Sequence, residues 1–350
     1  MKIPHLQRGF HISNAMATTQ ALRLGQRAVF RMTPLVRRPA FAALASTRAQ
    51  STLPIPPGSW DSHVHVVGDE AQYPLHPSHP YRPKPASLAS LQSFTANLHP
   101  NITRPVIVSL SVYANDNRCL LDALTDLKTQ GAVARGVVGI DPHTITDSEL
   151  SKMHDLGVRG VRLNLKSSLV ELSKSEFEKI LYRYADRLKP LKTWALQIHL
   201  SLPQVALISD IIPKLGVTTI IDHLAVPSTK QPAKAQEGYK DFMRLLSRGE
   251  VYTKLSGMDR FPTLPLLDEY ATDIVALAPD RIVWASDWPH TGGVGMNPGG
   301  DRNKVQDFRS VDDSAMLKKA VEVYCRGDEG VVKKIWRDNA TELWDYHGNE

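Results

Sequence analysis

Short runs of apolar, mostly β-branched residues alternate with longer amphipathic runs from residue 60 to the C-terminus. Apolar runs of four to eight residues, bounded by turn-forming residues, are typical of buried strands. Eight runs meet this description and predict strands at 60–66, 105–111, 135–140, 158–163, 194–200, 218–223, 251–255 and 282–287. The chain therefore contains enough strands for one large sheet.

The segments between these runs have helical periodicity. We expect helices at 117–129, 175–187, 203–215, 238–247 and 264–278, and a terminal helix at 328–344. Several begin at proline or at a capping residue, and Gly131, Gly157 and Gly216 stand where helices end before the next strand. Eight strands that alternate with helices over about 290 residues predict an α/β protein with a (β/α)8 (TIM) barrel.

Two further patterns refine this fold. No GxGxxG or GxxxxGK[ST] motif is present, so no nucleotide cofactor is expected. The long connections 67–87, 224–237 and 288–311 each follow a predicted strand. In a barrel, the loops after the strands form the active-site face, so these three segments are expected to shape a pocket.

Charge is distributed unevenly along the 350 residues. The formal net charge is +6, but residues 1–50 contain seven arginines, one lysine and no acidic residue. The other 300 residues contain 34 basic and 36 acidic residues. The barrel itself is thus nearly neutral, and we expect neither a nucleic-acid partner nor a membrane partner.

The N-terminal segment predicts targeting. Arg23, Arg27 and Arg31 lie four residues apart in a stretch without acidic residues, a pattern typical of mitochondrial transit peptides. We therefore expect residues 1–50 to direct the protein to the mitochondrial matrix, with 57–346 as the barrel domain. The alternative is a disordered tail on a cytoplasmic protein.

Polar side chains gather where the predicted strands end. His63 and His65 are two residues apart on one strand, so they face the same side. Buried polar groups are costly unless they are paired or functional. The other strands carry such groups near their ends: Arg162, Asn164, His199, His223, Lys254, Ser256 and Asp287.

Two kinds of chemistry fit these residues. His63, His65, His199 and Asp287 are suitable ligands for one divalent ion such as zinc, with His223 free to carry a proton. Alternatively, the imidazoles polarise a carbonyl group without a metal while Asp287 deprotonates the attacking water. The residue types favour neither scheme.

Five motifs together resemble the amidohydrolase-related family, and in particular its 2-pyrone-4,6-dicarboxylate hydrolases. They are DSHVHVVG at 61–68, YPLHPSHPYRP at 73–83, GVRGVRLN at 157–164, IIDHLAVP at 220–227 and ASDWPH at 285–290. The resemblance implies a barrel that hydrolyses a small carboxylated lactone. It implies Asp287 as general base, with His63, His65 and His223 polarising the carbonyl or orienting water. It also implies substrate binding through Arg162 and Arg260, with Tyr81, Ser111 and His199 at contact positions.

The chain departs from this pattern twice. The pyrone hydrolases have a further arginine where this chain has Ser168, with Lys166 as the nearest cation. They also have a tyrosine where this chain has His199, and a histidine there restores the ligand set of the metal-dependent relatives. A metal-dependent decarboxylase, in which the metal and His223 act on a carboxylate, and a barrel that only binds a metabolite are therefore alternatives.

Overall fold

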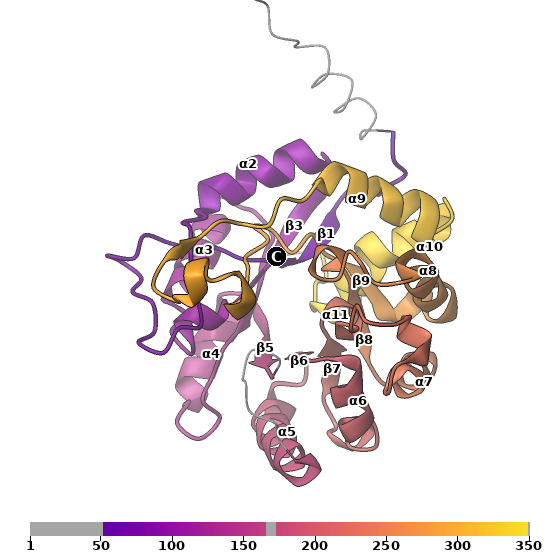
Figure 1. The fold of residues 1–350 in the computed structure, drawn as a ribbon. Coiled ribbons are helices and arrows are strands. Elements are labelled where there is room, and N and C mark those ends of the chain that lie inside the picture. The colour runs from indigo at the N-terminus through magenta and orange to yellow at the C-terminus, as the bar shows by residue number, and fades with distance from the viewer. Residues whose placement is uncertain (1–51, 166–172, 349–350) are drawn as a thin grey trace, which may run out of the picture. The chain divides into compact units, whose positions relative to one another are not determined.

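Eight parallel strands form the centre of the protein. The computed structural model describes residues 52–165 and 173–348. Within them the sheet has the order β1-β3-β4-β5-β6-β7-β8-β9, and the strands surround the centre of the molecule in Figure 1. Their bounds are β1 (Ser59–Val64), β3 (Ile102–Val108), β4 (Arg135–Val138), β5 (Val158–Asn164), β6 (Ala195–His199), β7 (Thr218–Ile221), β8 (Tyr252–Leu255) and β9 (Ile282–Trp284). The predicted (β/α)8 barrel is confirmed.

The barrel closes between the first and last strands of this sheet. The Asp287 amide donates to the His63 carbonyl at 2.9 Å, and the His65 amide donates to the Trp288 carbonyl at 2.8 Å. These bonds continue β1 and β9 as a parallel pair beyond their regular ends. Closure therefore brings the His63 and His65 segment directly beside Asp287.

Helices cover the outside of the barrel. The bounds are α2 (Leu88–Leu98), α3 (Arg118–Thr129), α4 (Asp147–Asp155), α5 (Lys174–Leu188), α6 (Leu202–Ile208), α7 (Tyr239–Ser247), α8 (Leu267–Leu277), α9 (Asp313–Lys319), α10 (Glu329–Lys333) and α11 (Asn339–Leu343). Capping boxes fix the starts of two of them, since Thr146 pairs with Glu149 at α4 and Ser173 with Glu176 at α5. No helix within 52–165 or 173–348 is long and apolar enough to cross a membrane.

Alternating side chains of the strands divide the apolar core in two. Ile107 packs outward against the helices, whereas Val106 and Val108 point into the barrel. The inner cluster also contains Trp344, whose indole Nε1 donates to the Ser62 hydroxyl at 3.1 Å. The C-terminal segment thus packs into the barrel at the end opposite the loops that follow the strands.

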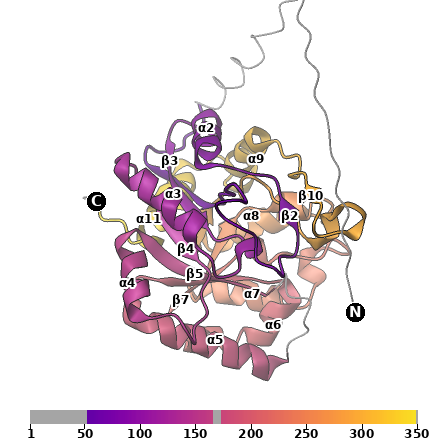
Figure 2. The same cartoon turned by 90° about the vertical axis from the view of Figure 1, so that its left-hand side faces the viewer.

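Two long loops are joined above the strand ends. The short strands β2 (Arg82–Pro83) and β10 (Val305–Gln306) pair in parallel and lie side by side in Figure 2. The Asn297 side chain adds a bond to the Pro80 carbonyl at 3.0 Å. The predicted loops 67–87 and 288–311 therefore form one cover over this face.

The structure adds detail to the predicted elements and shortens some of them. The predicted helix 203–215 ends at Ile208 and continues only as a separate turn at Ile212–Lys214, where Pro213 interrupts the helical hydrogen bonds. The terminal helix 328–344 consists of α10, a wider turn at Lys334–Asp338, and α11. Helices α2, α4 and α9 were not predicted. Residues 1–50, with the predicted targeting segment, and Ser168 and Lys166 lie outside the described residues.

Asp61 links the two strands that close the barrel, and its loss should destabilise the fold. Its Oδ1 accepts from the amides of Ser286 at 2.9 Å and of His63 at 3.4 Å, and the side chain is buried. Asp61→Ala leaves both donors buried without a partner. We expect the free energy of unfolding to fall by about 2 to 4 kcal/mol in urea titrations.

Two further variants serve as controls for Asp61. Asp61→Asn keeps the accepting oxygen and should cost less than about 1 kcal/mol, because only the amide group at the other position differs. Asp155→Ala on the exposed side of α4 should stay within about 0.5 kcal/mol of the parent protein. Equal stability of Asp61→Ala and the parent would show that these two bonds do not hold β1 against β9.

Candidate active site

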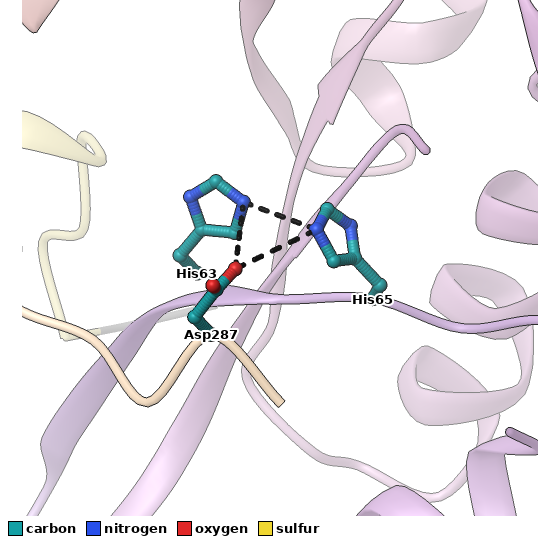
Figure 3. A group of neighbouring side chains, drawn as sticks. All are labelled: His63, His65 and Asp287. Carbon is teal, nitrogen blue, oxygen red and sulfur yellow. Dashed lines mark hydrogen bonds and ion pairs between the residues drawn. The ribbon is translucent and has the colours of Figure 1, made fainter. Parts of the chain in front are cut away.

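Two imidazoles and one carboxylate meet at the closure of the barrel. The Nε2 atoms of His63 and His65 are 3.3 Å apart, and Asp287 Oδ1 lies 3.9 Å from the first and 3.8 Å from the second (Figure 3). All three side chains are buried. The prediction that His63 and His65 face the same side is confirmed by this contact.

The two carboxylate oxygens of Asp287 have different surroundings. Arg260 donates to Oδ2 from Nε at 2.8 Å and from Nη2 at 2.5 Å. Arg309 Nη2 lies 3.6 Å from the same oxygen. Oδ1 has no hydrogen-bond partner among the described residues, although it is buried. The two bonds from Arg260 fix the carboxylate through Oδ2 and leave Oδ1 as the oxygen that can accept a proton.

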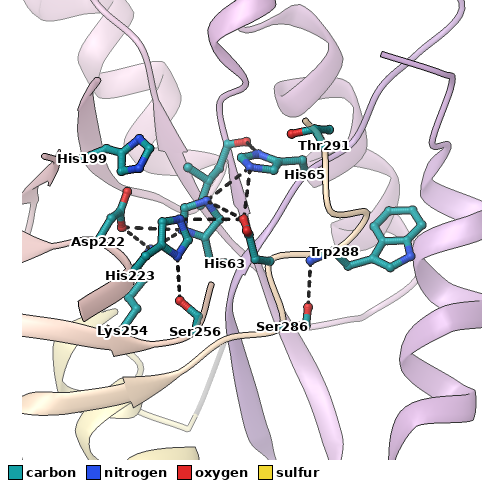
Figure 4. Close-up of polar contacts among 12 residues, drawn as sticks. His63, His65, His199, Asp222, His223, Lys254, Ser256, Ser286, Trp288 and Thr291 are labelled. Atoms are coloured by element: carbon teal, nitrogen blue, oxygen red, sulfur yellow. Dashed lines mark hydrogen bonds and ion pairs between the residues drawn. The ribbon is translucent and has the colours of Figure 1, made fainter. Parts of the chain in front are cut away.

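A third imidazole, that of His223, approaches Asp287 Oδ1 with its Nε2 at 3.8 Å. Its Nδ1 is 2.8 Å from the Ser256 hydroxyl, and its ring lies 4.7 Å from that of His63 between centroids (Figure 4). The backbone here has left β7: His223 has φ 51° and is followed by three more residues in the left-handed region. Gly257 allows the close approach, because a Cβ there would lie 2.9 Å from the His223 ring.

A layer of charged and polar groups lies beneath these imidazoles. Asp222 Oδ2 accepts from Gln197 Nε2 at 3.0 Å and from Arg162 Nε at 3.2 Å. Lys254 Nζ is 2.7 Å from Gln197 Oε1, 3.2 Å from His63 Nδ1 and 3.6 Å from Asp222 Oδ1. These contacts tie β5, β6, β7 and β8 together below the site.

A cavity of about 210 Å³ opens above this cluster, between the strand ends and the joined loops. His65 forms part of its wall, and the predicted contact residues Tyr81, Ser111, Arg162, His199 and Arg260 line it as well. Tyr81 donates to the Thr291 hydroxyl at 3.2 Å, which links the two loops of the cover. The predicted site residues therefore lie around one cavity or directly below it.

Burial and the surrounding cations keep the imidazoles neutral. Burial lowers the pKa of His65 to about 3 and places the pKa values of His63 and His223 well below the usual range. Burial raises the pKa of Asp222, but the lowering effects of Lys254, His223 and Arg162 together outweigh burial and leave the pKa low. The Lys254 pKa falls to about 8 because of burial, so the amine is still an ammonium at neutral pH.

These shifts predict that acid destabilises the protein between pH 6.5 and 4.5. In the unfolded chain the imidazoles of His63, His65 and His223 take up protons below about pH 6.5, whereas in the folded protein they stay neutral. Stability is therefore lost as the pH falls, by about 1.4 kcal/mol per pH unit for each imidazole. Urea unfolding at a series of pH values measures this slope.

Asp61 acts in the opposite direction and gives the control. Burial raises the pKa of Asp61 to about 7, so as the pH falls the folded state takes up this proton at a higher pH than the unfolded chain does. The contribution of Asp61 to the free energy of unfolding is therefore present below about pH 4 and is lost as the pH rises through 7. This pH dependence is opposite to that of the imidazoles and cancels the contribution of one of them. Asp61→Asn should steepen the loss by about 1.4 kcal/mol per unit, and a flat profile in both proteins would contradict the neutral imidazoles.

Three residues could hold a divalent ion by position. His63, His65 and Asp287 each offer one ligand atom, all within 4.8 Å of one another, and the Asp287 oxygen is otherwise unpartnered. Ligands of one tetrahedral zinc ion lie about 3.3 Å apart, which is near the observed spacing. The predicted fourth ligand, His199, is not in this group: its Nδ1 is 3.2 Å from Asn164 Oδ1, and its ring is 5.4 Å from that of His223.

Strand alternation would place the neighbours Asp222 and His223 on opposite faces, but β7 ends at Ile221 and the turn brings both side chains to the site. Arg260 lines the cavity, and its Nε and Nη2 hold Asp287, so its binding of a substrate carboxylate stays a prediction. The sequence does not identify Gln197 and Arg309 as residues of the site. Each contacts another polar side chain of the site, and neither residue type nor spacing in the sequence predicts such a contact.

The fold and this cluster define a class: a (β/α)8 barrel whose histidines and aspartate lie at the carboxyl ends of the strands, the face that carries the active site in such barrels. The family model described as amidohydrolase matches residues 60–346, and the chain belongs to this family. The resemblance seen in the sequence motifs is therefore confirmed.

Relatives with defined activities are similar over most of the chain. The 2-pyrone-4,6-dicarboxylate hydrolase of Comamonas testosteroni is 30% identical over 249 residues, which cover 67% of this chain and 78% of that protein. A 4-sulfomuconolactone hydrolase of Hydrogenophaga intermedia is 28% identical over 246 residues, which cover 68% and 77%. A solved structure from Acinetobacter baumannii, a probable 2-pyrone-4,6-dicarboxylic acid hydrolase with citric acid bound, has a TM-score of 0.63 at 22% identity and covers 83% of this chain and 100% of that one.

Proposed function

We propose that this protein hydrolyses a small lactone that carries an anionic substituent. The observation that carries the proposal is the free Oδ1 of Asp287, surrounded by three neutral imidazoles below a cavity that contains two arginines. The names of the two relatives support it, because both act on lactones with a carboxylate or sulfonate group.

In this reaction Asp287 acts as the general base. Arg260 fixes the carboxylate through Oδ2, so that Oδ1 takes the proton from the attacking water. Ser256 orients His223, and a proton on Nε2 of this ring would polarise the lactone carbonyl when the Ser256 hydroxyl donates to Nδ1. The ring C–O bond then breaks, the proton taken up by Asp287 passes to the leaving ring oxygen, and an open-chain acid remains.

Arg162 is the residue proposed to hold the anionic substituent. Its guanidinium lines the cavity, and Asp222 fixes its orientation at 3.2 Å. A planar guanidinium pairs with carboxylate or sulfonate oxygens through two parallel bonds.

The proposal is tested with the purified protein and a set of lactones. The set contains 2-pyrone-4,6-dicarboxylate, 4-sulfomuconolactone and an uncharged lactone of similar size. We expect ring opening of at least one anionic lactone, with release of one proton per turnover at fixed pH. Release of CO₂ would support the decarboxylase alternative, and tight binding without turnover would support a binding protein.

A further inference from the structure

We propose that Lys254 is a positioning residue that keeps the proton of the His63 imidazole on Nε2 and thereby keeps a divalent cation out of the His63, His65 and Asp287 group. As a statement about the reaction, this role rests on the proposed function. The geometry that carries it does not depend on any substrate.

Lys254 has a restricted set of partners. It lies on β8 with no exposed surface, and its Nζ faces Gln197 Oε1 at 2.7 Å. The same Nζ lies 3.2 Å from His63 Nδ1 (Figure 4). Asp222 Oδ1 is the third neighbour at 3.6 Å. An ammonium group can only donate hydrogen bonds, so Nδ1 of His63 is the accepting nitrogen.

The tautomer of His65, which contacts His63, is fixed as well. His65 Nδ1 lies 2.7 Å from the Val108 carbonyl, and a carbonyl oxygen can only accept. The proton of neutral His65 is thus on Nδ1, and its Nε2 has a lone pair. The 3.3 Å contact with His63 Nε2 is then a hydrogen bond that His63 donates. Both tautomers therefore follow from two partners: the Lys254 ammonium can only donate a hydrogen bond, and the Val108 carbonyl can only accept one.

This arrangement opposes metal binding. A metal would need the lone pair of His63 Nε2, and the displaced proton would have to move to Nδ1, where it would face the Lys254 ammonium. Histidine ligands in metal sites usually donate their second N–H to a carboxylate or a carbonyl. Asp222 Oδ1 has no hydrogen bond to any described residue and lies 3.6 Å from His63 Nδ1, so it could accept such a bond once the ammonium is gone.

The hydrogen bond between His63 and His65, which Lys254 maintains, also affects catalysis. With Lys254 in place, His63 and His65 are held to each other as neutral rings, and Asp287 Oδ1 remains the group that can take a proton. Loss of the ammonium would let His63 change tautomer and turn toward Asp222. We therefore expect Lys254→Met to lower kcat by about 10- to 100-fold and to leave KM within about threefold, as is typical when an orienting partner is removed.

The decisive experiment reads the tautomers directly. Long-range proton–nitrogen NMR spectra of ¹⁵N-histidine-labelled protein, assigned with a His63→Asn variant, should show the proton on Nε2 of His63 and on Nδ1 of His65. In Lys254→Met, the His63 proton should move to Nδ1. Equilibrium dialysis against Zn²⁺ should then show binding at least about 10-fold tighter than in the parent protein. Lys234→Met, which removes an exposed lysine beside Glu269, should match the parent in both measurements.

A His63 proton on Nδ1 in the parent protein would overturn the proposal, and so would a folded Lys254→Met protein with unchanged tautomers and zinc affinity. If that variant does not fold, the spectrum of the parent protein still decides. The lactone assay gives a separate result: the predicted tautomers without any lactone turnover would refute the proposed function and leave the metal-excluding role of Lys254 standing.

Discussion

Asp287→Asn should lower kcat for lactone opening by about 10²- to 10⁴-fold, the contribution typical of a general base. Arg260 can only donate, so the amide oxygen will take the place of Oδ2 and the NH₂ group will take the place of Oδ1. The group that faces the water then has no proton affinity. KM should change by less than about threefold, because Asp287 is not in the wall of the cavity.

The measurement needs a check on folding, because the substitution leaves the half-buried Arg260 without a full counter-charge. Circular dichroism and thermal unfolding identify any loss of structure. Asp210→Asn removes an exposed aspartate that pairs with Lys174 and should retain the parent kcat. Unchanged turnover in a folded Asp287→Asn protein would remove this residue from the mechanism.

The strands were predictable because each is a short apolar run, and their polar ends were predictable because such groups are rare beside buried strands. The two-residue spacing of His63 and His65 was enough to place both rings on one face. Helix α4 could also have been predicted, since Thr146 and Glu149 form a capping box that can be recognised in the sequence.

The rest of the site depends on tertiary structure. Asp222 reaches the site only because the backbone after β7 turns into the left-handed region. The residue types at 223–226 do not predict this turn. Lys254 meets Gln197 across the inside of the barrel, although 57 positions separate them in the chain. Such pairs depend on the stagger of the strands around the barrel, and strand patterns alone do not define that stagger.

The two arginines at the cavity should differ in what their loss changes. Arg162→Met should raise KM for an anionic lactone by about 10- to 100-fold, since charge-assisted hydrogen bonds contribute roughly 1.5 to 3 kcal/mol. An uncharged lactone has no anionic group for this guanidinium to bind, so its KM should change much less. Arg260→Met should instead lower kcat for both lactones, because its two hydrogen bonds to Asp287 Oδ2 orient the base. Steady-state kinetics of both variants with both lactones separate these effects, and a rise in KM for the anionic lactone in Arg260→Met alone would exchange the two assignments.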